Sequence, residues 1–114
     1  MSEQESAVRE LAPSPLADAL TRVGDRWTLL VVQALLTGPR RFNELRRDVV
    51  GVSGKVLSQR LQRLHADGIV ERRVMPTSPP TVEYELTEFG REVLPAVDAI
   101  VKVGHRLKAR RAAA

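Results

Sequence analysis

The fold of this chain is decided by residues 52–68, VSGKVLSQRLQRLHADG. Ser53 is a favourable N-cap residue, because its hydroxyl can accept a hydrogen bond from a free backbone N–H at the start of a helix. Leu57, Leu61 and Leu64 follow at spacings of four and three, so they lie on one face of that helix. A glycine closes the stretch, as is typical where a helix ends. The stretch therefore predicts an amphipathic helix, residues 53–67, with one buried edge.

Three more helices are predicted before this one. Ser14 and Pro15 suit the N-cap and the first position of a helix that runs to about residue 23. A second helix begins near Asp25 and is stopped by the glycine and proline at positions 38 and 39. Residues 41–49 form a third, short helix, which a tight turn separates from Ser53.

A β-hairpin and a last helix are predicted after it. Residues 69–75 and 81–86 are rich in β-branched and alternating side chains, and a proline-rich loop separates them. Thr87 can cap a long final helix, and Pro95 within that helix is expected to kink it.

The order of these elements predicts the fold class. A short helix, a tight turn, a serine-capped helix and then a hairpin are typical of a winged helix-turn-helix, an α+β fold that is mostly helical. At 114 residues the chain fits one domain. We expect a flexible arm over residues 1–13, a winged-helix core over 14–87, and a C-terminal dimerisation helix with a basic tail over 88–114.

The last helix has no place in the core of a minimal winged domain, so a partner is expected to cover its apolar stripe. Its near-seven-residue rhythm favours a seam against a second copy of the chain, although an ordinary core element is the alternative. The residues predicted to form this dimer interface are Phe89, Val93, Val97, Ile100, Val101, Gly104 and Leu107.

The outward face of the helix over residues 53–67 carries amides and cations and no acid. Glutamine amides can pair with adenine edges, and lysine reaches guanine O6 and N7. A solvated helix face is the alternative, but the position directly after a helix-turn unit favours contact with bases. The residues predicted to contact bases are Lys55, Ser58, Gln59 and Gln62.

Basic residues gather around this helix. Residues 40–73 hold nine basic and four acidic side chains, a net charge of +5 against +4 for the whole chain. Such a surface suits DNA phosphates, although some arginines are expected to pair with Glu44 or Asp48 instead. The residues predicted to contact the DNA backbone are Arg40, Arg41, Arg46, Ser53, Arg60 and Arg63. The hairpin loop has no cation between Met75 and Thr81, so its own contact is expected to be weak.

Other classes of protein find little support. The chain has no cysteine, so it offers no disulfide and no thiolate, and His65 and His105 lack carboxylate companions for a metal site. No catalytic constellation and no cofactor motif is present, so we expect no enzyme and no cofactor. The N-terminus lacks the pattern of a secretory signal, and no apolar run suits a membrane span. A cytoplasmic location is expected.

Several motifs together resemble the HxlR-type regulators, a family related to the MarR regulators. Residues 24–30, GDRWTLL, resemble the family's G-G-K-W-x-L-L, and residues 38–47, GPRRFNELRR, are similar to its G-x-x-R-F-N-E-L-R-R. Residues 52–61 resemble I-S-x-K-x-L-T-x-x-L, and the stretches 67–72 and 79–90 complete the match. The resemblance covers roughly residues 14–105.

This resemblance implies a bacterial transcription regulator. Its members are winged-helix homodimers that bind inverted-repeat operators in double-stranded DNA, more often as repressors, with the first and last helices forming the dimer contact. Many relatives carry a sensing cysteine where this chain has Ser14, and a basic residue where it has Thr81. Two alternatives stay open. One is a regulator gated by a small molecule in a pocket near Trp27 and the dimer helix, and the other is a winged-helix module for protein interaction.

Overall fold

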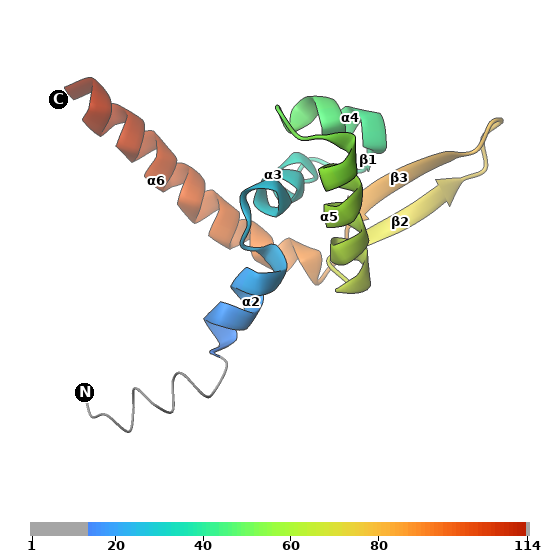
Figure 1. Cartoon of the computed structure of the whole chain (residues 1–114), viewed down its shortest axis with the longest axis horizontal. Helices are drawn as coiled ribbons and strands as arrows, with labels where there is room; N and C mark the ends of the chain where they lie inside the picture. Colours follow the sequence, from blue (N-terminus) through green and yellow to red (C-terminus); the bar gives the residue numbers. More distant parts are fainter. Residues whose placement is uncertain (1–13, 114) are drawn as a thin grey trace.

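The computed structural model describes residues 14–113, so the predicted arm over residues 1–13 lies outside the described residues. The elements, in chain order, are α2 (Pro15–Val23), α3 (Arg26–Ala34), β1 (Arg40–Arg41), α4 (Phe42–Asp48), α5 (Gly54–Ala66), β2 (Val70–Met75), β3 (Thr81–Leu86), the 3₁₀ helix η1 (Gly90–Val93) and α6 (Leu94–Ala113). The helices α3, α4 and α5 form a cluster from which the β2–β3 hairpin and α6 extend in different directions (Figure 1). This is the predicted winged helix-turn-helix.

The core lies between α3, α4, α5 and the base of the sheet. Leu57, Leu61 and Leu64 of α5 are at most 2% exposed, which confirms the buried edge predicted from their spacing. They belong to one cluster of buried side chains that also includes Val31, Val32, Leu35, Leu45, Val49, Val52, Ile69, Val70, Leu86 and Val97. Burial of these apolar side chains fixes α5 relative to the rest of the domain.

The ends of α5 follow the local sequence. Ser53 has extended backbone angles, and its hydroxyl accepts a hydrogen bond from the Val56 backbone N–H at 3.1 Å. Gly68 follows the helix with φ of +73°, a left-handed conformation that costs little only in glycine. Both ends of the predicted helix are therefore confirmed.

The sheet has a strand that the sequence did not predict. Its order is β1–β3–β2, and β1 pairs antiparallel with β3, with Arg40 opposite Tyr84 and Arg41 opposite Glu83. Arg41 was expected inside the third helix, but it is extended and forms the N-cap position of α4. A strand of two arginines has no apolar alternation to reveal it, since its existence depends on the distant partner β3.

The start of the last helix also differs from the prediction. The chain first forms the short helix η1, whose Gly90 backbone N–H donates to the Thr87 hydroxyl at 2.9 Å. The long helix α6 begins only at Leu94, so Pro95 lies in its first turn. The expected kink was wrong, because first-turn N–H groups have no partner within the helix and proline is tolerated there. No helix in the described part of the chain combines the length and the apolar content needed to cross a membrane.

Candidate nucleic-acid interface

The outer face of α5, which we define as Lys55, Ser58, Gln59 and Gln62, is exposed along the whole helix. It lies opposite the three buried leucines, and it includes no acidic side chain. None of its four side chains has a hydrogen bond or an ion pair to another described residue. These side chains are therefore free to contact a polyanion or a base edge.

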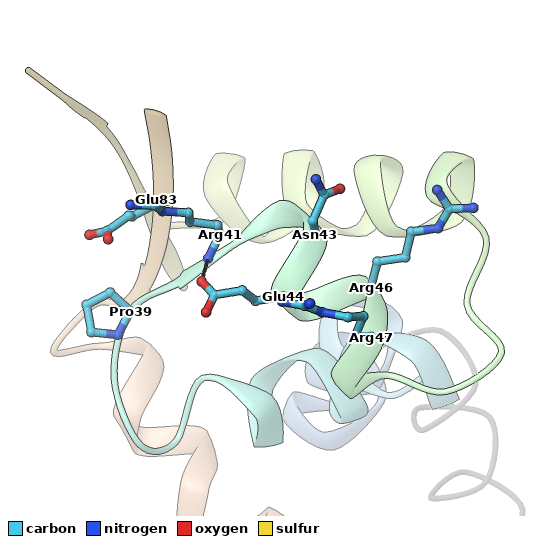
Figure 2. A pocket seen from close by; sticks show the side chains of 7 residues that line it. All are labelled: Pro39, Arg41, Asn43, Glu44, Arg46, Arg47 and Glu83. Atoms are coloured by element: carbon cyan, nitrogen blue, oxygen red, sulfur yellow. Dashed lines mark hydrogen bonds between the residues drawn. The ribbon is translucent and has the colours of Figure 1, made fainter. Parts of the chain in front are cut away.

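A hollow of about 930 Å³ adjoins the start of α4 (Figure 2). Its lining residues are Pro39, Arg41, Asn43, Glu44, Arg46, Arg47 and Glu83. Asn43 and Arg46 project toward the side of α5, and a side chain at Gly54 would lie 3.6 Å from the Arg46 guanidinium. Arg46 thus lies over the first turn of α5, beside Ser53, where both suit an anion.

Two carboxylates limit the positive charge of this hollow. Glu44 accepts a hydrogen bond from the Arg41 backbone N–H at 2.9 Å, which caps α4 (Figure 2). Glu83 lies opposite Arg41 in the sheet. Arg40 is also occupied, because its guanidinium donates to the Thr37 hydroxyl at 2.9 Å and lies 3.7 Å from Asp48. Arg46 and Arg47 are the arginines of α4 that have no ion pair within the described part of the chain.

Arg60 and Arg63, both predicted to contact the DNA backbone, point toward α3. Arg60 Nε lies 3.0 Å from Asp25 Oδ1, and Arg63 Nη1 lies 4.0 Å from Asp25 Oδ2. Arg60 precedes Leu61 by one residue, so it lies at the border of the buried face, where α3 covers it. The structure therefore places Arg60 in an internal ion pair and away from the outer face of α5.

A second ion pair joins α5 to the preceding helices. Arg22, in the last turn of α2, lies 2.8 Å from Asp67 at the C-terminal end of α5. Together with Asp25 and Arg60, it fixes the flank of α5 that faces α2 and α3. The flank on the other side faces the hairpin.

Asp25 has the most constrained carboxylate in this region. It caps α3 by accepting from the Thr28 backbone N–H at 3.1 Å, and the fully buried Thr28 hydroxyl also donates to it. Burial alone would raise the pKa of Asp25, but the hydrogen bonds from Thr28 and Arg60 outweigh it, so the pKa is lowered. A lowered pKa means that the ionised group stabilises the folded state above the unfolded-state pKa. This contribution is lost as the pH falls through the folded-state pKa.

Asp25→Ala is expected to lower the free energy of unfolding by about 0.5–2 kcal/mol at pH 7, the usual cost of removing a helix N-cap. The deficit should shrink below about pH 4, where the wild-type carboxylate becomes protonated. Urea denaturation of both proteins at pH 7 and pH 3 measures it. Asp98→Ala is the matched control, since it removes only an exposed pair with Lys102 and should change little. A deficit equal at both pH values contradicts the role given to the ionised Asp25.

Comparison with known proteins decides the family. The model of the HxlR-like helix-turn-helix family matches residues 22–112. The chain belongs to the HxlR-like helix-turn-helix family. The HTH-type transcriptional regulator YtfH of Escherichia coli is 44% identical over 86 residues, which cover 75% of this chain and 68% of YtfH. Family membership confirms the predicted class, a helix-turn-helix transcriptional regulator and not an enzyme.

Solved structures agree with this assignment. The redox regulator HypR in its oxidised form is 38% identical with a TM-score of 0.78, covering 82% of this chain and 96% of HypR. A regulator of the MarR family from Enterococcus faecalis V583 is 28% identical with a TM-score of 0.73, covering 100% of this chain and 96% of the regulator. The predicted relation to MarR regulators is confirmed.

The predicted dimer seam of this HxlR-like protein divides into two sets. Val97 is 9% exposed, and Val93 and Val101 are half-buried, because α6 packs on α3 and on the rest of its own core. By contrast, Ile100 is 56% and Leu107 is 52% exposed, and Phe89 and Gly104 are also exposed. Sequence periodicity identified the apolar positions but not which of them pack inside the subunit.

Further apolar side chains that the sequence analysis did not assign to the interface are exposed near this seam. Leu16 and Leu20 of α2 are 68% and 52% exposed, and Val103 of α6 is also exposed. The helical spacing of Leu16 and Leu20 was the available signal. It was interpreted as a core stripe, but none of the residues of α2 is buried.

Trp27 packs against the core and lies under the Arg26 guanidinium, which is 4.6 Å from the ring centroid. A separate apolar hollow of about 120 Å³ lies between α3 and α6, lined by Leu29, Leu30, Gln33, Val97, Ile100 and Val101. Within residues 14–113, no three His, Asp or Glu side chains lie close enough to hold a metal ion.

Proposed function

We propose that this HxlR-like regulator is a homodimeric repressor that binds an inverted-repeat operator in double-stranded DNA. The observation that carries the proposal is the outer face of α5, which is exposed, free of acid and held rigidly by a buried leucine edge. A helix of this kind fits the major groove, where each base pair presents a distinct pattern of donors and acceptors. We place this activity in the cytoplasm, where bacterial DNA lies.

In the proposed complex, two copies of α5 enter successive major grooves, ~34 Å apart. Lys55, Ser58, Gln59 and Gln62 contact base edges. Ser53, Arg41 and Arg46, together with the free N–H groups at the start of α5, contact phosphates. Bound protein then excludes polymerase, so repression is the expected output.

The dimer is proposed to form through the exposed apolar side chains of α2 and α6. Ile100 and Leu107 lie on one side of α6, and Leu16 and Leu20 are exposed on α2. Covering such side chains with a second copy removes apolar surface from water. A two-fold dimer also matches the symmetry of an inverted repeat.

Gln59→Ala is expected to relax sequence preference at one position in each half-site, because it removes an amide that can pair with adenine. The expected cost is about 1–3 kcal/mol for the preferred base at that position. The measurement is a gel shift against a duplex selected from a random pool by the wild-type protein, together with every single-base variant of that duplex.

Arg47→Ala is the control for that experiment. An exposed arginine of α4 is expected to act on phosphates, so its loss should weaken all the duplexes by a similar factor. If Gln59→Ala binds every duplex as the wild type does, contact between Gln59 and a base is ruled out. If the wild-type protein selects no preferred sequence, the protein-interaction module replaces the operator-binding proposal.

The hollow between α3 and α6 supports a second proposal, control by a small apolar ligand. Its lining is almost wholly apolar, and its residues belong both to the core and to the proposed dimer helix. The similar protein HypR is named a redox regulator, but this chain has no cysteine and so has no thiol to oxidise. A ligand that changes operator affinity and Trp27 fluorescence together would support this mode of control.

A further inference from the structure

The strand β2 carries two neighbouring arginines that face opposite sides of the sheet. Arg72 is paired across the ladder with Tyr84, and Arg73 is paired with Glu83. Successive side chains of a strand point to opposite faces, so the Arg72–Tyr84 pair lies on the same face as the buried Val70 and Leu86. This is the face that packs toward α5.

Arg73 is already neutralised by acidic neighbours. Its guanidinium donates to Glu85 at 2.8 Å and to Glu71 at 3.2 Å. The hydrogen bond to Glu71 and the charge of Glu85 raise the pKa of Arg73. The face of the hairpin that points away from α5 therefore holds a closed charge network.

Arg72 has no such partner. No acidic side chain in the described part of the chain forms an ion pair with it, and its side chain is exposed. It lines a cleft of about 270 Å³ between α5 and the hairpin. The cleft is lined by Ser58, Leu61, Gln62, His65, Arg72 and Tyr84, which include no carboxylate.

The two walls of this cleft are fixed relative to each other. Leu61 is buried between α5 and the sheet, and the His65 ring nitrogen Nδ1 lies 3.2 Å from the Val70 carbonyl oxygen. Because a carbonyl oxygen only accepts, the ring hydrogen is assigned to Nδ1. The guanidinium of Arg72 is thus placed beside Ser58 and Gln62, two residues of the outer face of α5, with little conformational freedom left to lose on binding.

We propose that this cleft binds a backbone phosphate of DNA, with Arg72 as its cation. The inference rests on the proposed function, because α5 in a major groove has a sugar–phosphate strand along each of its flanks. On one flank Arg60 and Asp25 neutralise each other. On the other flank Arg72 stands unpaired beside the outer face of α5. The hairpin therefore contacts DNA from its base, although its loop between Met75 and Thr81 has no cation.

Arg72→Ala and Arg73→Ala form a matched pair of variants that tests this inference. Both remove one arginine from the same strand, but only Arg72 faces the cleft. Dissociation constants are measured between 50 and 200 mM KCl on two probes, the duplex selected by the wild type and a scrambled duplex of equal length. Arg72→Ala should reduce the slope of log affinity against log salt by about 1, and Arg73→Ala should leave it unchanged.

The loss caused by Arg72→Ala should be about three- to fourfold larger at 50 mM than at 200 mM salt, and of similar size on both probes. Arg72→Gln, which keeps a polar side chain, should show the same loss of slope, whereas Arg72→Lys should largely restore the wild-type slope. Thermal unfolding of each variant identifies those that are folded, and only these are compared.

Each outcome separates the two proposals. A wild-type protein that binds neither duplex overturns the proposed function itself. If the wild type binds and folded Arg72 variants keep its salt slope, or if Arg73→Ala loses as much slope, the cleft is not a phosphate site. A loss confined to the selected duplex would assign Arg72 to a base, and this also overturns the inference.

Discussion

Leu107→Asp is expected to lower affinity for a two-half-site operator by about 10²–10⁴-fold, the typical gain from linking two binding units. Leu107 is about half exposed on α6, on the same side as Ile100. A carboxylate at this position would have to be buried in the proposed dimer contact without a partner, which costs several kcal/mol per ion. The expected product is a folded monomer that binds a single half-site weakly.

Ala109→Asp is the matched control for this variant. It adds the same charge two residues later, where the helical repeat places it on the opposite side of α6. Sedimentation equilibrium gives the mass of each protein, and gel shifts with one and two half-sites give the affinities. A Leu107→Asp protein that remains dimeric and binds the operator normally would show that the seam lies elsewhere.

Gly90→Ala is expected to lower the free energy of unfolding by about 3 kcal/mol, at the upper end of what overpacking normally costs. A Cβ at position 90 would overlap the backbone carbonyl oxygen of Ile69. That oxygen cannot move freely, because it accepts the Thr87 backbone N–H at 3.0 Å. The clash lies where η1 crosses the base of the hairpin, so the connection to α6 would have to shift.

Gly54→Ala serves as the comparison, because a Cβ there meets only ordinary contacts with the flexible side chain of Arg46. Its expected change in stability is small. Urea denaturation with equal slopes for all proteins gives the difference. Equal stability of Gly90→Ala and the wild type would mean that the close approach of η1 to Ile69 is absent in solution.

Local signals predicted the elements whose determinants are neighbours in sequence. The serine cap and the leucine spacing of α5 lie within one stretch, and the structure confirms both. The two-residue strand β1 and the short helix η1 were missed because they depend on contacts with β3 and Ile69. Neither leaves a periodic pattern of its own.

The candidate site shows the same limit at the level of side chains. The exposure of Lys55, Gln59 and Gln62 follows from the helical repeat, so these residues were predictable. Arg60 and Arg72 looked alike in the sequence, as two arginines near one helix. Asp25, 35 residues away, occupies the first, and the absence of any facing acid leaves the second unpaired. Such a difference arises only from tertiary contacts.

The ion pairs Arg22–Asp67 and Asp25–Arg60 have a consequence for how operators are discriminated. They attach α5 to both α2 and α3, so a displacement of α2 would carry α5 along as one body. In a dimer this would alter the separation of the two copies of α5 and leave the side chains that each presents unchanged. Variation in this pair of contacts would therefore appear as a new preferred number of base pairs between half-sites, with the letters of each half-site conserved.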